Sequence, residues 1–457
     1  KEAGLAHPWL GAGIDISFRL YHFSSFLICA VNALAFLAIL YSASSLSGKP
    51  SAKHFFVFLL LNLGFAQGAV LAGNLITMLF FWEGSLVTLF AMIAIGGNGS
   101  FKTAKKALVI SGLCDLCLML GIGIYGKLAG SFAISGERMG VSGLGGAAFI
   151  LMMIGAIGKT GAMPFHSWIP DAGTDAPLPF MAIIPGSLDK LIGIYLLTRI
   201  SLDLFARDMH SWASITLMTV GAATIIFAVM MALVQKDYKR LLAYHAISQA
   251  GYMVLGIGTF TAAGILGGLF HMLNNAIYKC ALFMTGGSVE KQAGTTDLER
   301  LGGLARNMPY TFAFFLITAA SIAGVPPLNG FFSKELIYSG ALSRGSIFYL
   351  AAAAGTFLTA ASFLKLGHAA YLGKRHDSNN NVKESSALML GPMLCLALSC
   401  VLLGLNNSWV VRHLFEPVLG EGMGAAAHHE GAEWNSPLVM ITIAVLAMAL
   451  LNHAFGV

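Results

Sequence analysis

Apolar runs of about 20 residues recur along this chain from Tyr21 almost to Val457. A helix of that length is what crosses the hydrocarbon core of a bilayer. Of the 457 residues, 57% are hydrophobic and only 11% are charged, well below the roughly 25% charged residues of soluble domains. The runs keep the pattern of continuous helix and lack the alternation of barrel strands. The sequence therefore predicts an all-α, polytopic membrane protein with about thirteen transmembrane helices.

The predicted spans follow one another closely along the chain. They lie at 20–44, 54–72, 74–96, 104–126, 146–164, 176–200, 210–234, 239–258, 262–287, 309–345, 346–371, 386–405 and 436–456. The run 309–345 is too long for one plain crossing, and Pro326, Pro327 and Gly330 interrupt it. Because proline removes a main-chain donor and clashes with the preceding turn, we expect a broken helix there.

Two blocks of five spans stand out. In each block the fourth span is interrupted by Gly and Pro, at 158–164 and at 324–330. An odd number of spans inverts the second block relative to the first, and broken helices at corresponding places in inverted halves point to an ion site. The alternative is that Gly and Pro are simply common in membrane helices. The predicted segments are 1–53 with the first span, a five-helix repeat at 54–200, its inverted counterpart at 210–371, and C-terminal spans with a loop at 372–457.

Basic residues gather in loops that fall on one side of the predicted membrane. The loops near 45–53, 97–106 and 235–240 carry Lys49, Lys53, Lys102, Lys105, Lys106, Lys236, Lys239 and Arg240. The loops of the opposite side, near 127–143 and 200–209, carry only Lys127, Arg138 and Arg207. By the positive-inside rule the first set is cytoplasmic, and we expect the cytoplasmic (inner) membrane of a prokaryote. This asymmetry explains the net charge of +6 without a nucleic-acid partner.

Charged residues inside the apolar runs are the strongest functional signal. Glu83, Lys159, Lys190, Lys279 and Lys334 fall within or at the edge of predicted spans. A charge near the bilayer centre costs at least ~2.5–3.5 kcal/mol, and such residues usually mark an ion or proton path. We expect Lys159 to pair with Glu83, because a nearby lysine makes a buried carboxylate tolerable. Opening such a pair releases the lysine proton; the alternative is a static pair that only fixes helix packing.

His271 is a further candidate, since histidine titrates nearest to physiological pH. It shares one helix face with Asn275 and Lys279, which follow four and eight residues later. Asp115 sits in the middle of a span and is a candidate partner for Lys106.

Two other polar positions have simpler explanations. Lys365 is equally well explained as a snorkelling lysine. Ser248 and Gln249 are better explained as helix contacts than as water ligands.

Nothing in the sequence predicts a cofactor or a metal in this chain. Cys114 and Cys117 form a C-x-x-C, but cysteines on one membrane helix are better explained as small packing residues. The run His428-His429-Glu430 lies in a Gly/Ala-rich stretch, 418–432, which is better explained as a solvated loop than as a metal site. Redox chemistry, if involved, belongs to a partner.

Several motifs resemble one family of membrane proteins. The run LVQKDYKRLLAYHAISQAGY, residues 233–252, looks like the most recognisable segment of the antiporter-like membrane subunits of respiratory complex I. That family also includes subunits of multi-subunit Na⁺/H⁺ antiporters and of membrane-bound energy-converting NiFe hydrogenases. The matching motifs are Trp82-Glu83-Gly84, 158–164 with 168–172, 271–283 and 324–335, and the resemblance covers roughly residues 15–375.

The resemblance implies a fourteen-helix core, so that two family helices are missing before this chain, which does not begin with Met. It implies that Glu83 and Lys159 form the pair at the start of a half-channel. Lys190 and Lys279 then bridge the central axis beside His271, and Lys334 is the terminal lysine facing the exit half-channel.

The sequence departs from the family pattern in three places. Asn275 stands where members often have a second histidine, and the stretch 185–190 differs from the usual eighth helix, which leaves the register of Lys190 against the family pattern open. The chain ends at Val457, before the long lateral helix of the most distal complex I subunit. We therefore expect a middle-type subunit, or one from a hydrogenase or an antiporter.

The leading interpretation is an ion-translocating subunit of a membrane-bound redox complex, which moves H⁺ or Na⁺ and does no redox chemistry itself. Its expected partners are other membrane subunits of a hetero-oligomer, peripheral subunits with iron–sulfur clusters, and the lipid bilayer. The alternatives are a subunit of a multi-subunit Na⁺/H⁺ antiporter without redox coupling, the membrane module of an inorganic-carbon uptake system, and a scaffold with an inert charge network.

Overall fold

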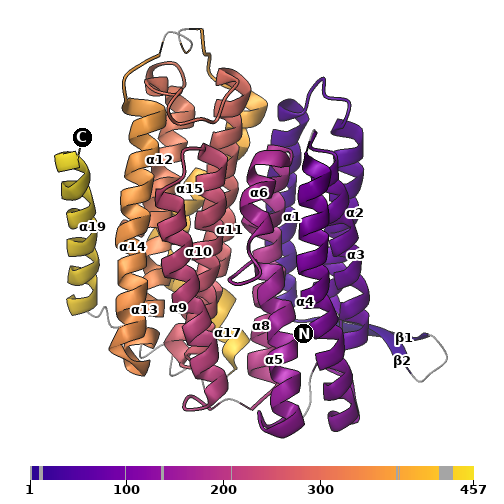
Figure 1. Ribbon diagram of the computed structural model, residues 1–457. Coiled ribbons are helices and arrows are strands. Elements are labelled where there is room, and N and C mark those ends of the chain that lie inside the picture. The colour runs from indigo at the N-terminus through magenta and orange to yellow at the C-terminus, as the bar shows by residue number, and fades with distance from the viewer. Residues whose placement is uncertain are drawn as a thin grey trace.

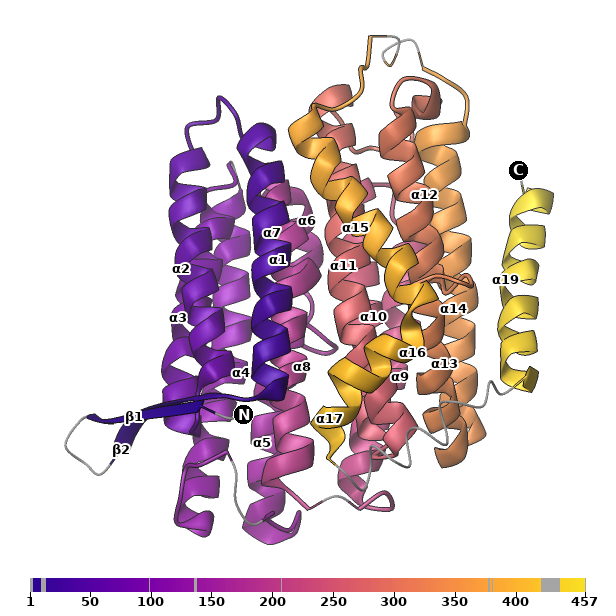
Figure 2. The same ribbon diagram turned by 180° about the vertical axis from the view of Figure 1, so that it is seen from behind.

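The structure is a computed structural model that describes residues 3–9, 14–97, 99–134, 138–206, 208–376, 379, 381–420 and 436–456. Its body is a bundle of long, upright helices (Figure 1). Helices from the first part of the chain form one side of this upright bundle and later helices form the other side, as the view from behind also shows (Figure 2). The predicted all-α membrane fold is confirmed for this body.

Within the described residues, an N-terminal hairpin departs from that prediction. Strands β1 (Ala3–Trp9) and β2 (Ile14–Leu20) pair antiparallel and project from the side of the bundle (Figure 2). The Trp9 ring meets the ring of Phe80 edge-on at 5.3 Å, which ties the hairpin to the first helices. The segment is short and of mixed polarity, so its residue pattern did not distinguish strand from loop.

The helices of the first part of the chain cover the first six predicted spans, and one further short helix, Trp168–Asp175, lies outside every predicted span. They are α1 (His22–Ser45), α2 (Ala52–Leu71), α3 (Leu75–Ala94), α4 (Ser100–Ala129), α5 (Gly143–Thr160) and α6 (Trp168–Asp175), followed by a continuous helix of α7 (Leu178–Ile183), a π-helical turn (Ile184–Leu188), α8 (Asp189–Arg199) and a second π-helical turn (Ile200–Leu204).

The later helices correspond to the remaining spans. They are α9 (Trp212–Leu233), α10 (Tyr238–Gly258), α11 (Ala262–Ala293), α12 (Pro309–Ala323), α13 (Asn329–Arg344), α14 (Ser346–Gly367), α15 (Ala387–Leu405), α16 (Asn407–Val410), α17 (Glu416–Leu419) and α19 (Ser436–Gly456). The short helices α16 and α17 follow α15 in a segment where no helix was predicted.

Ten helices within the described residues are long and apolar enough to cross a membrane. The count differs from about thirteen because α10, α11 and the α12–α13 pair are not among them. Both α10 and α11 are almost wholly buried and carry polar groups such as His245, Gln249, His271 and Lys279. They lie in the protein interior, where polar side chains find protein partners instead of lipid.

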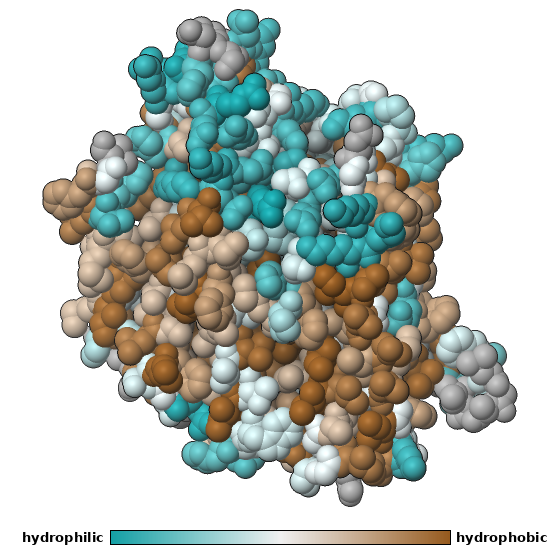
Figure 3. Space-filling view, in the orientation of Figure 1, coloured by the Kyte–Doolittle hydropathy of each residue, from teal (hydrophilic) through white to brown (hydrophobic). Residues whose placement is uncertain are grey.

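The surface agrees with a membrane-embedded bundle. Figure 3 shows apolar residues spread over the middle and lower part of one face, with hydrophilic residues gathered at the upper end. The α1–α2, α3–α4 and α9–α10 connections lie at this upper end (Figure 1). These are the connections that carry the basic residues predicted to be cytoplasmic.

Close helix packing in the second half depends on glycine. A Cβ atom on Gly251 of α10 would lie 2.7 Å from the carbonyl oxygen of Gly221 on α9, and one on Gly221 would meet the backbone of Leu255. Small residues at such crossings let two backbones approach closely, which is how helices associate in a membrane.

Both predicted interruptions are present. Helix α5 ends at Thr160 and α12 at Ala323, and the glycines that follow, Gly161 and Gly324, have φ of 68° and 86°. Glycine closes a helix in this left-handed conformation without a Cβ penalty. The chain then restarts as α6 and α13. The last carbonyl groups of α5 and α12 therefore need partners inside the bundle.

Candidate functional site

Lys159 lies in the last turn of α5 and is 6% exposed. Its ammonium donates a short hydrogen bond to the Ser85 hydroxyl. The nearest carboxylate oxygen is Oδ1 of Asp189, 3.9 Å away, and the Trp82 ring centroid lies 5.3 Å away. Lys159 is thus held between α3 and α8, with an aromatic face on one side.

The predicted contact pair of Glu83 and Lys159 is wrong in this structure. Glu83 feels the charge of Lys159, but the ion pair within 4 Å goes to Asp189. The reason is helix geometry, because residues two apart are turned by about 200°. When Ser85 binds the lysine, Glu83 points elsewhere, and its Oε1 is buried with no hydrogen-bond partner among the described residues.

The predicted partner of Asp115 is also wrong. Its Oδ1 accepts a hydrogen bond of 2.7 Å from the indole nitrogen of Trp82, and Oδ2 is buried with no partner among the described residues. Lys106 is nine residues earlier on α4, about 13 Å along the helix axis, and binds Asp171 instead. Asp115 therefore joins the cluster around Lys159, whose charge it feels.

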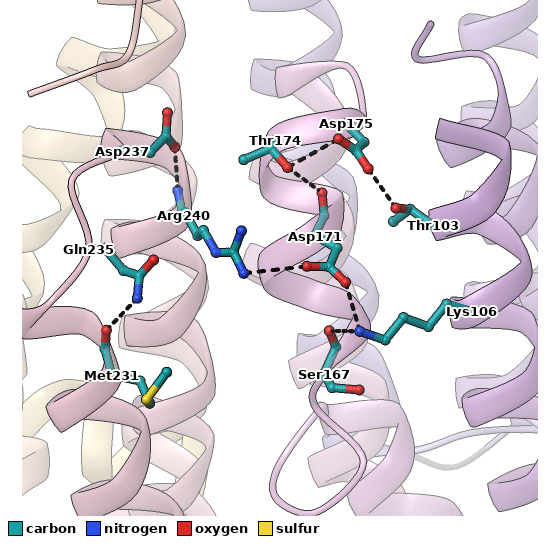
Figure 4. Close-up of polar contacts among 10 residues, drawn as sticks. All are labelled: Thr103, Lys106, Ser167, Asp171, Thr174, Asp175, Met231, Gln235, Asp237 and Arg240. Carbon is teal, nitrogen blue, oxygen red and sulfur yellow. Dashed lines mark hydrogen bonds and ion pairs between the residues drawn. The ribbon is translucent and has the colours of Figure 1, made fainter. Parts of the chain in front are cut away.

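Asp171, on α6, bridges the two parts of the bundle (Figure 4). Its Oδ2 lies 2.7 Å from the ammonium of Lys106 on α4, and its Oδ1 lies 3.6 Å from the guanidinium of Arg240 on α10. Lys106 also donates to the Ser167 carbonyl at 2.8 Å. The half-helix after the first break is thereby tied to both sides at the end predicted to be cytoplasmic.

Lys190 lies on α8 and is fully buried. Its ammonium lies 3.6 Å from the position that a Cβ atom on Gly161 would occupy, at the end of α5. Within the described residues its Nζ has no hydrogen-bond partner.

Lys279 lies on α11 and is also fully buried. Its ammonium donates to the Leu242 carbonyl at 3.0 Å and faces the rings of Phe283 and Phe363 at 5.8 and 5.6 Å. Lys190 is near enough for the two positive charges to repel each other. These two lysines, one on α8 and one on α11, therefore lie near each other in the interior.

His271 is bonded through both ring nitrogens. Nδ1 lies 2.9 Å from the Ser333 hydroxyl, and Nε2 lies 3.0 Å from the Gln249 oxygen and 3.2 Å from the Tyr278 hydroxyl. The sequence predicts that His271 and Asn275 lie on one face of their helix, but the two side chains do not share a partner in the described structure. Asn275 donates to the Gly186 carbonyl at 3.2 Å. Gln249, expected to be only a helix contact, is a direct partner of His271.

Lys334 lies in the second turn of α13, just after the second break. Its ammonium donates to the carbonyls of Ile322 and Ala323, at 2.8 and 3.4 Å, and to the Thr356 hydroxyl at 3.2 Å. Three acceptors match the three N–H donors of an ammonium. The neighbouring Glu335 instead accepts from Thr442 of α19 at 2.6 Å.

These side chains form a buried row across the molecule. We use "the buried row" for Glu83, Asp115, Lys159, Asp189, Lys190, Lys279, His271 and Lys334. It runs from α3, α4 and α5 through α8 and α11 to α13. Lys365 stands apart, because its ammonium donates to the carbonyls of Leu233 and Gln235 at 2.7 and 2.9 Å, at the C-terminal end of α9.

Several members and partners of the row were missed from the sequence. Ser85, Asp189, Ser333 and Thr356 each touch a lysine or histidine of the row. The available signal was that hydroxyl and carboxyl groups within apolar runs need a partner. What the sequence does not specify is which helix supplies it.

No group of three or more His, Cys, Asp or Glu side chains suited to a metal ion occurs in the described part of the chain. The predicted loop residues His428, His429 and Glu430 lie outside that part. Cys114 is buried, and a Cβ on Gly158 of α5 would touch its sulfur and Cβ atoms, as expected of a packing residue.

Comparison with known proteins gives one family match. The family described as "NADH:quinone oxidoreductase/Mrp antiporter, TM" matches residues 72–359, a range that contains every member of the buried row.

Three curated proteins with related sequences are components of cation/proton antiporters. A probable K⁺/H⁺ antiporter component of Rhizobium meliloti is 29% identical over 452 residues, covering 95% of this chain and 45% of that protein. A Na⁺/H⁺ antiporter component of Alkalihalophilus pseudofirmus is 29% identical over 390 residues, covering 84% of this chain and 78% of that protein. A Na⁺/H⁺ antiporter component of Staphylococcus haemolyticus is 32% identical over 444 residues, covering 90% and 54%. The chain thus spans about half the length of the Rhizobium and Staphylococcus relatives.

Three solved structures have the same fold. A chain of the Mrp complex from Dietzia sp. aligns with a TM-score of 0.81 and 23% identity, over 97% of this chain and 89% of that one. A chain of the membrane-bound sulfane sulfur reductase, an archaeal respiratory membrane complex, gives 0.79 and 26%, over 90% and 69%. A chain of respiratory complex I from Thermus thermophilus gives 0.82 and 22%, over 93% and 89%. All three are chains of membrane complexes.

Proposed function

Because the chain belongs to the NADH:quinone oxidoreductase/Mrp antiporter transmembrane family, we propose that it is the proton-translocating subunit of a hetero-oligomeric membrane complex. The observation that carries the proposal is the buried row, in which ionisable side chains meet two broken helices. Charges inside a membrane are costly and mark ion or proton paths. Broken helices in corresponding places supply the polar backbone that such a path needs.

The row suits protons, because its members exchange protons themselves. Four of them are lysines, and ammonium groups repel a bare cation while each carries one proton that it can release. Their hydrogen bonding differs along the row. Lys334 has three acceptors, Lys279 has one carbonyl, and Lys190 has none among the described residues. A proton that moves along the row therefore changes the hydrogen bonding of each side chain that it visits.

The proton path begins at the cluster of side chains around Lys159. Its ammonium is held by Ser85 and lies 3.9 Å from Asp189, a distance that a small movement of α5 against α8 changes. Because the Coulomb energy between two buried charges depends steeply on their separation, such a movement switches Lys159 between holding and releasing its proton.

Two energy sources remain candidates for driving this movement. The curated relatives are components of K⁺/H⁺ and Na⁺/H⁺ antiporters and cover 84% to 95% of the chain, which favours exchange of protons for another cation. The similarity in fold to the sulfane sulfur reductase chain, at 26% identity, favours a redox-driven complex whose electron carriers lie in other subunits. In both cases the expected location is the cytoplasmic membrane of a prokaryote.

The test is proton movement by the whole complex, purified through a tag on this chain and placed in liposomes. Wild type is compared with Lys159→Ala and Asp189→Asn, and Lys365→Gln serves as the control outside the row. We expect both row variants to lose proton movement while the complex stays assembled and the control keeps it. Unchanged proton movement in both row variants would overturn the proposal.

The same liposomes distinguish the two energy sources. Proton movement that needs an electron donor identifies a redox-driven complex. Exchange driven by an imposed Na⁺ or K⁺ gradient, without a donor, identifies an antiporter.

A further inference from the structure

We propose that His245 is an additional proton carrier of this protein, acting between Lys279 and Lys334. The inference rests on the proposed function, because a carrier needs a proton flux to carry. The residue belongs to α10, the buried helix that also supplies Gln249 as the partner of His271. Its geometry differs from that of a histidine that only supports packing.

One side of the His245 ring is anchored. Nε2 lies 2.8 Å from the hydroxyl oxygen of Ser362 on α14, and the ring lies 4.7 Å from the ring of Phe363 at an angle of 38°. The side chain is fully buried. The ring is therefore held in one orientation by α14, and its other nitrogen points away from that contact.

The other ring nitrogen of His245 has no hydrogen-bond partner in the described structure, and we call it the open nitrogen. Nδ1 of His245 is buried and has no hydrogen-bond partner among the described residues. Leaving a buried polar atom unpaired costs about 1–3 kcal/mol, and native proteins contain few such atoms. His271 shows the contrast, because both of its nitrogens are bonded, to Ser333 and to Gln249.

The open nitrogen is what a carrier requires. A neutral imidazole has one donor and one acceptor nitrogen, so with its Nε2–H donated to Ser362, His245 can accept a proton from Lys279 on Nδ1. It can then give the proton on Nδ1 to Lys334. The Ser362 hydroxyl oxygen accepts from Nε2–H before and after this step, so the anchor is kept and Ser362 itself carries no proton along the path. No bond other than N–H and O–H bonds is made or broken in this step.

His245 is placed between two lysines of the buried row, Lys279 and Lys334. The Lys279 ammonium binds the carbonyl of Leu242, one turn before His245 on α10, and faces the same Phe363 ring at 5.6 Å. The charged groups that act on His245 are Lys279 of α11 and Lys334 of α13. Histidine therefore fills the gap between two lysines that have no direct contact with each other in the described structure.

The experiment compares four forms of the whole complex in liposomes: wild type, His245→Gln, Ser362→Ala, and His245→Gln combined with Asn275→His. Glutamine keeps a side-chain group that bonds Ser362 but cannot carry a proton in this way. Ser362→Ala removes the anchor and keeps the imidazole. Asn275 lies one turn from Lys279 on the same face of α11, so a histidine there returns an imidazole to the row from another helix.

We expect His245→Gln to reduce proton movement about tenfold or more, since a positioned proton donor or acceptor contributes at least that much to a transfer rate. Ser362→Ala should keep most of the rate, and the double variant should recover part of it. A wild-type rate in His245→Gln would overturn the proposal. A loss that Asn275→His does not restore would do so too, since it assigns His245 a packing role.

These outcomes are separable from failure of the proposed function. If Lys159→Ala abolishes proton movement while His245→Gln does not, the protein translocates protons without His245. If wild type and every variant leave the proton gradient unchanged, the proposed function itself fails.

Discussion

The ammonium of Lys334 lies 2.8 Å from the main-chain oxygen of Ile322, where α12 ends inside the bundle. Lys365 makes the same kind of contact with Leu233, at 2.7 Å, where α9 ends. A cation at a helix C-terminus is favourable because it meets unpaired carbonyls and the negative end of the helix dipole. The two lysines have the same structural task, but only Lys334 belongs to the buried row.

Comparing variants of Lys334 and Lys365 distinguishes a role in helix capping from a role in proton transport. We expect Lys334→Gln to abolish proton movement, because glutamine still donates to the carbonyls but carries no exchangeable charge. Lys365→Gln should leave the rate within about twofold. Each variant should lose about 1–2 kcal/mol of stability through the weakened charged hydrogen bonds, measured as a lower melting temperature of the complex. Equal transport loss in both variants would mean that helix capping, and not the proton, is what Lys334 contributes.

A second prediction concerns the two carboxylates near Lys159. Asp189 is the one in contact, at 3.9 Å, whereas Glu83 is half-buried and acts at longer range. Breaking a buried pair by removing one partner costs about 3–5 kcal/mol. We therefore expect Asp189→Asn to lower the melting temperature of the complex more than Glu83→Gln, and to reduce proton movement at least as strongly. The reverse order would restore the sequence-based pairing of Glu83 with Lys159.

The spans, the two breaks and most of the row were predictable because each has a local cause. Apolar length predicts a crossing, Gly and Pro predict a break, and a charge in an apolar run predicts function whatever it contacts. The partners were not predictable in this way. Ser85 and Lys159 are 74 residues apart, and which of Ser85 and Glu83 faces α5 depends on the rotation of α3, which packing decides.

The other features that the sequence did not predict were missed because they also depend on contacts between distant segments or lack a local signal. Asp115 was assigned to a lysine of its own helix, but its partner is the indole of Trp82 on the neighbouring α3. His245 carried no separate signal, because a histidine in a helix motif looks like any buried polar residue until the open nitrogen is seen. The hairpin at Ala3–Leu20 was missed because short strands outside the membrane lack the long apolar run that marks a span.

The tryptophan contact gives a third prediction with a close control. Trp82 and Trp168 are both 1% exposed, but only the Trp82 indole donates to a carboxylate, whereas Trp168 Nε1 has no acceptor among the described residues. Trp82→Phe leaves Asp115 without its donor, a loss of about 1–3 kcal/mol beyond the change in packing. We expect Trp82→Phe to lower the melting temperature of the complex clearly more than Trp168→Phe. Similar losses would mean that the Asp115 contact adds nothing to stability.

The last prediction concerns the glycine that closes α5. Gly130, at the end of α4, and Gly161 have nearly the same φ, 66° and 68°, so alanine at either site meets the same left-handed strain of about 1–2 kcal/mol. Their surroundings differ. A Cβ on Gly130 meets open space, whereas one on Gly161 meets the side chain of Ile169 and lies 3.6 Å from the Lys190 ammonium.

We therefore expect Gly130→Ala to cost stability alone and Gly161→Ala to cost stability and transport together. The added methyl group pushes α6 away from the end of α5 and moves Lys190 relative to Lys159. Proton movement and melting temperature are measured on the same two preparations. A Gly161→Ala complex that is destabilised like Gly130→Ala but pumps at the wild-type rate would show that the geometry of the first break is not needed for proton transfer. The two sites share the backbone strain and differ in the contacts with Ile169 and Lys190.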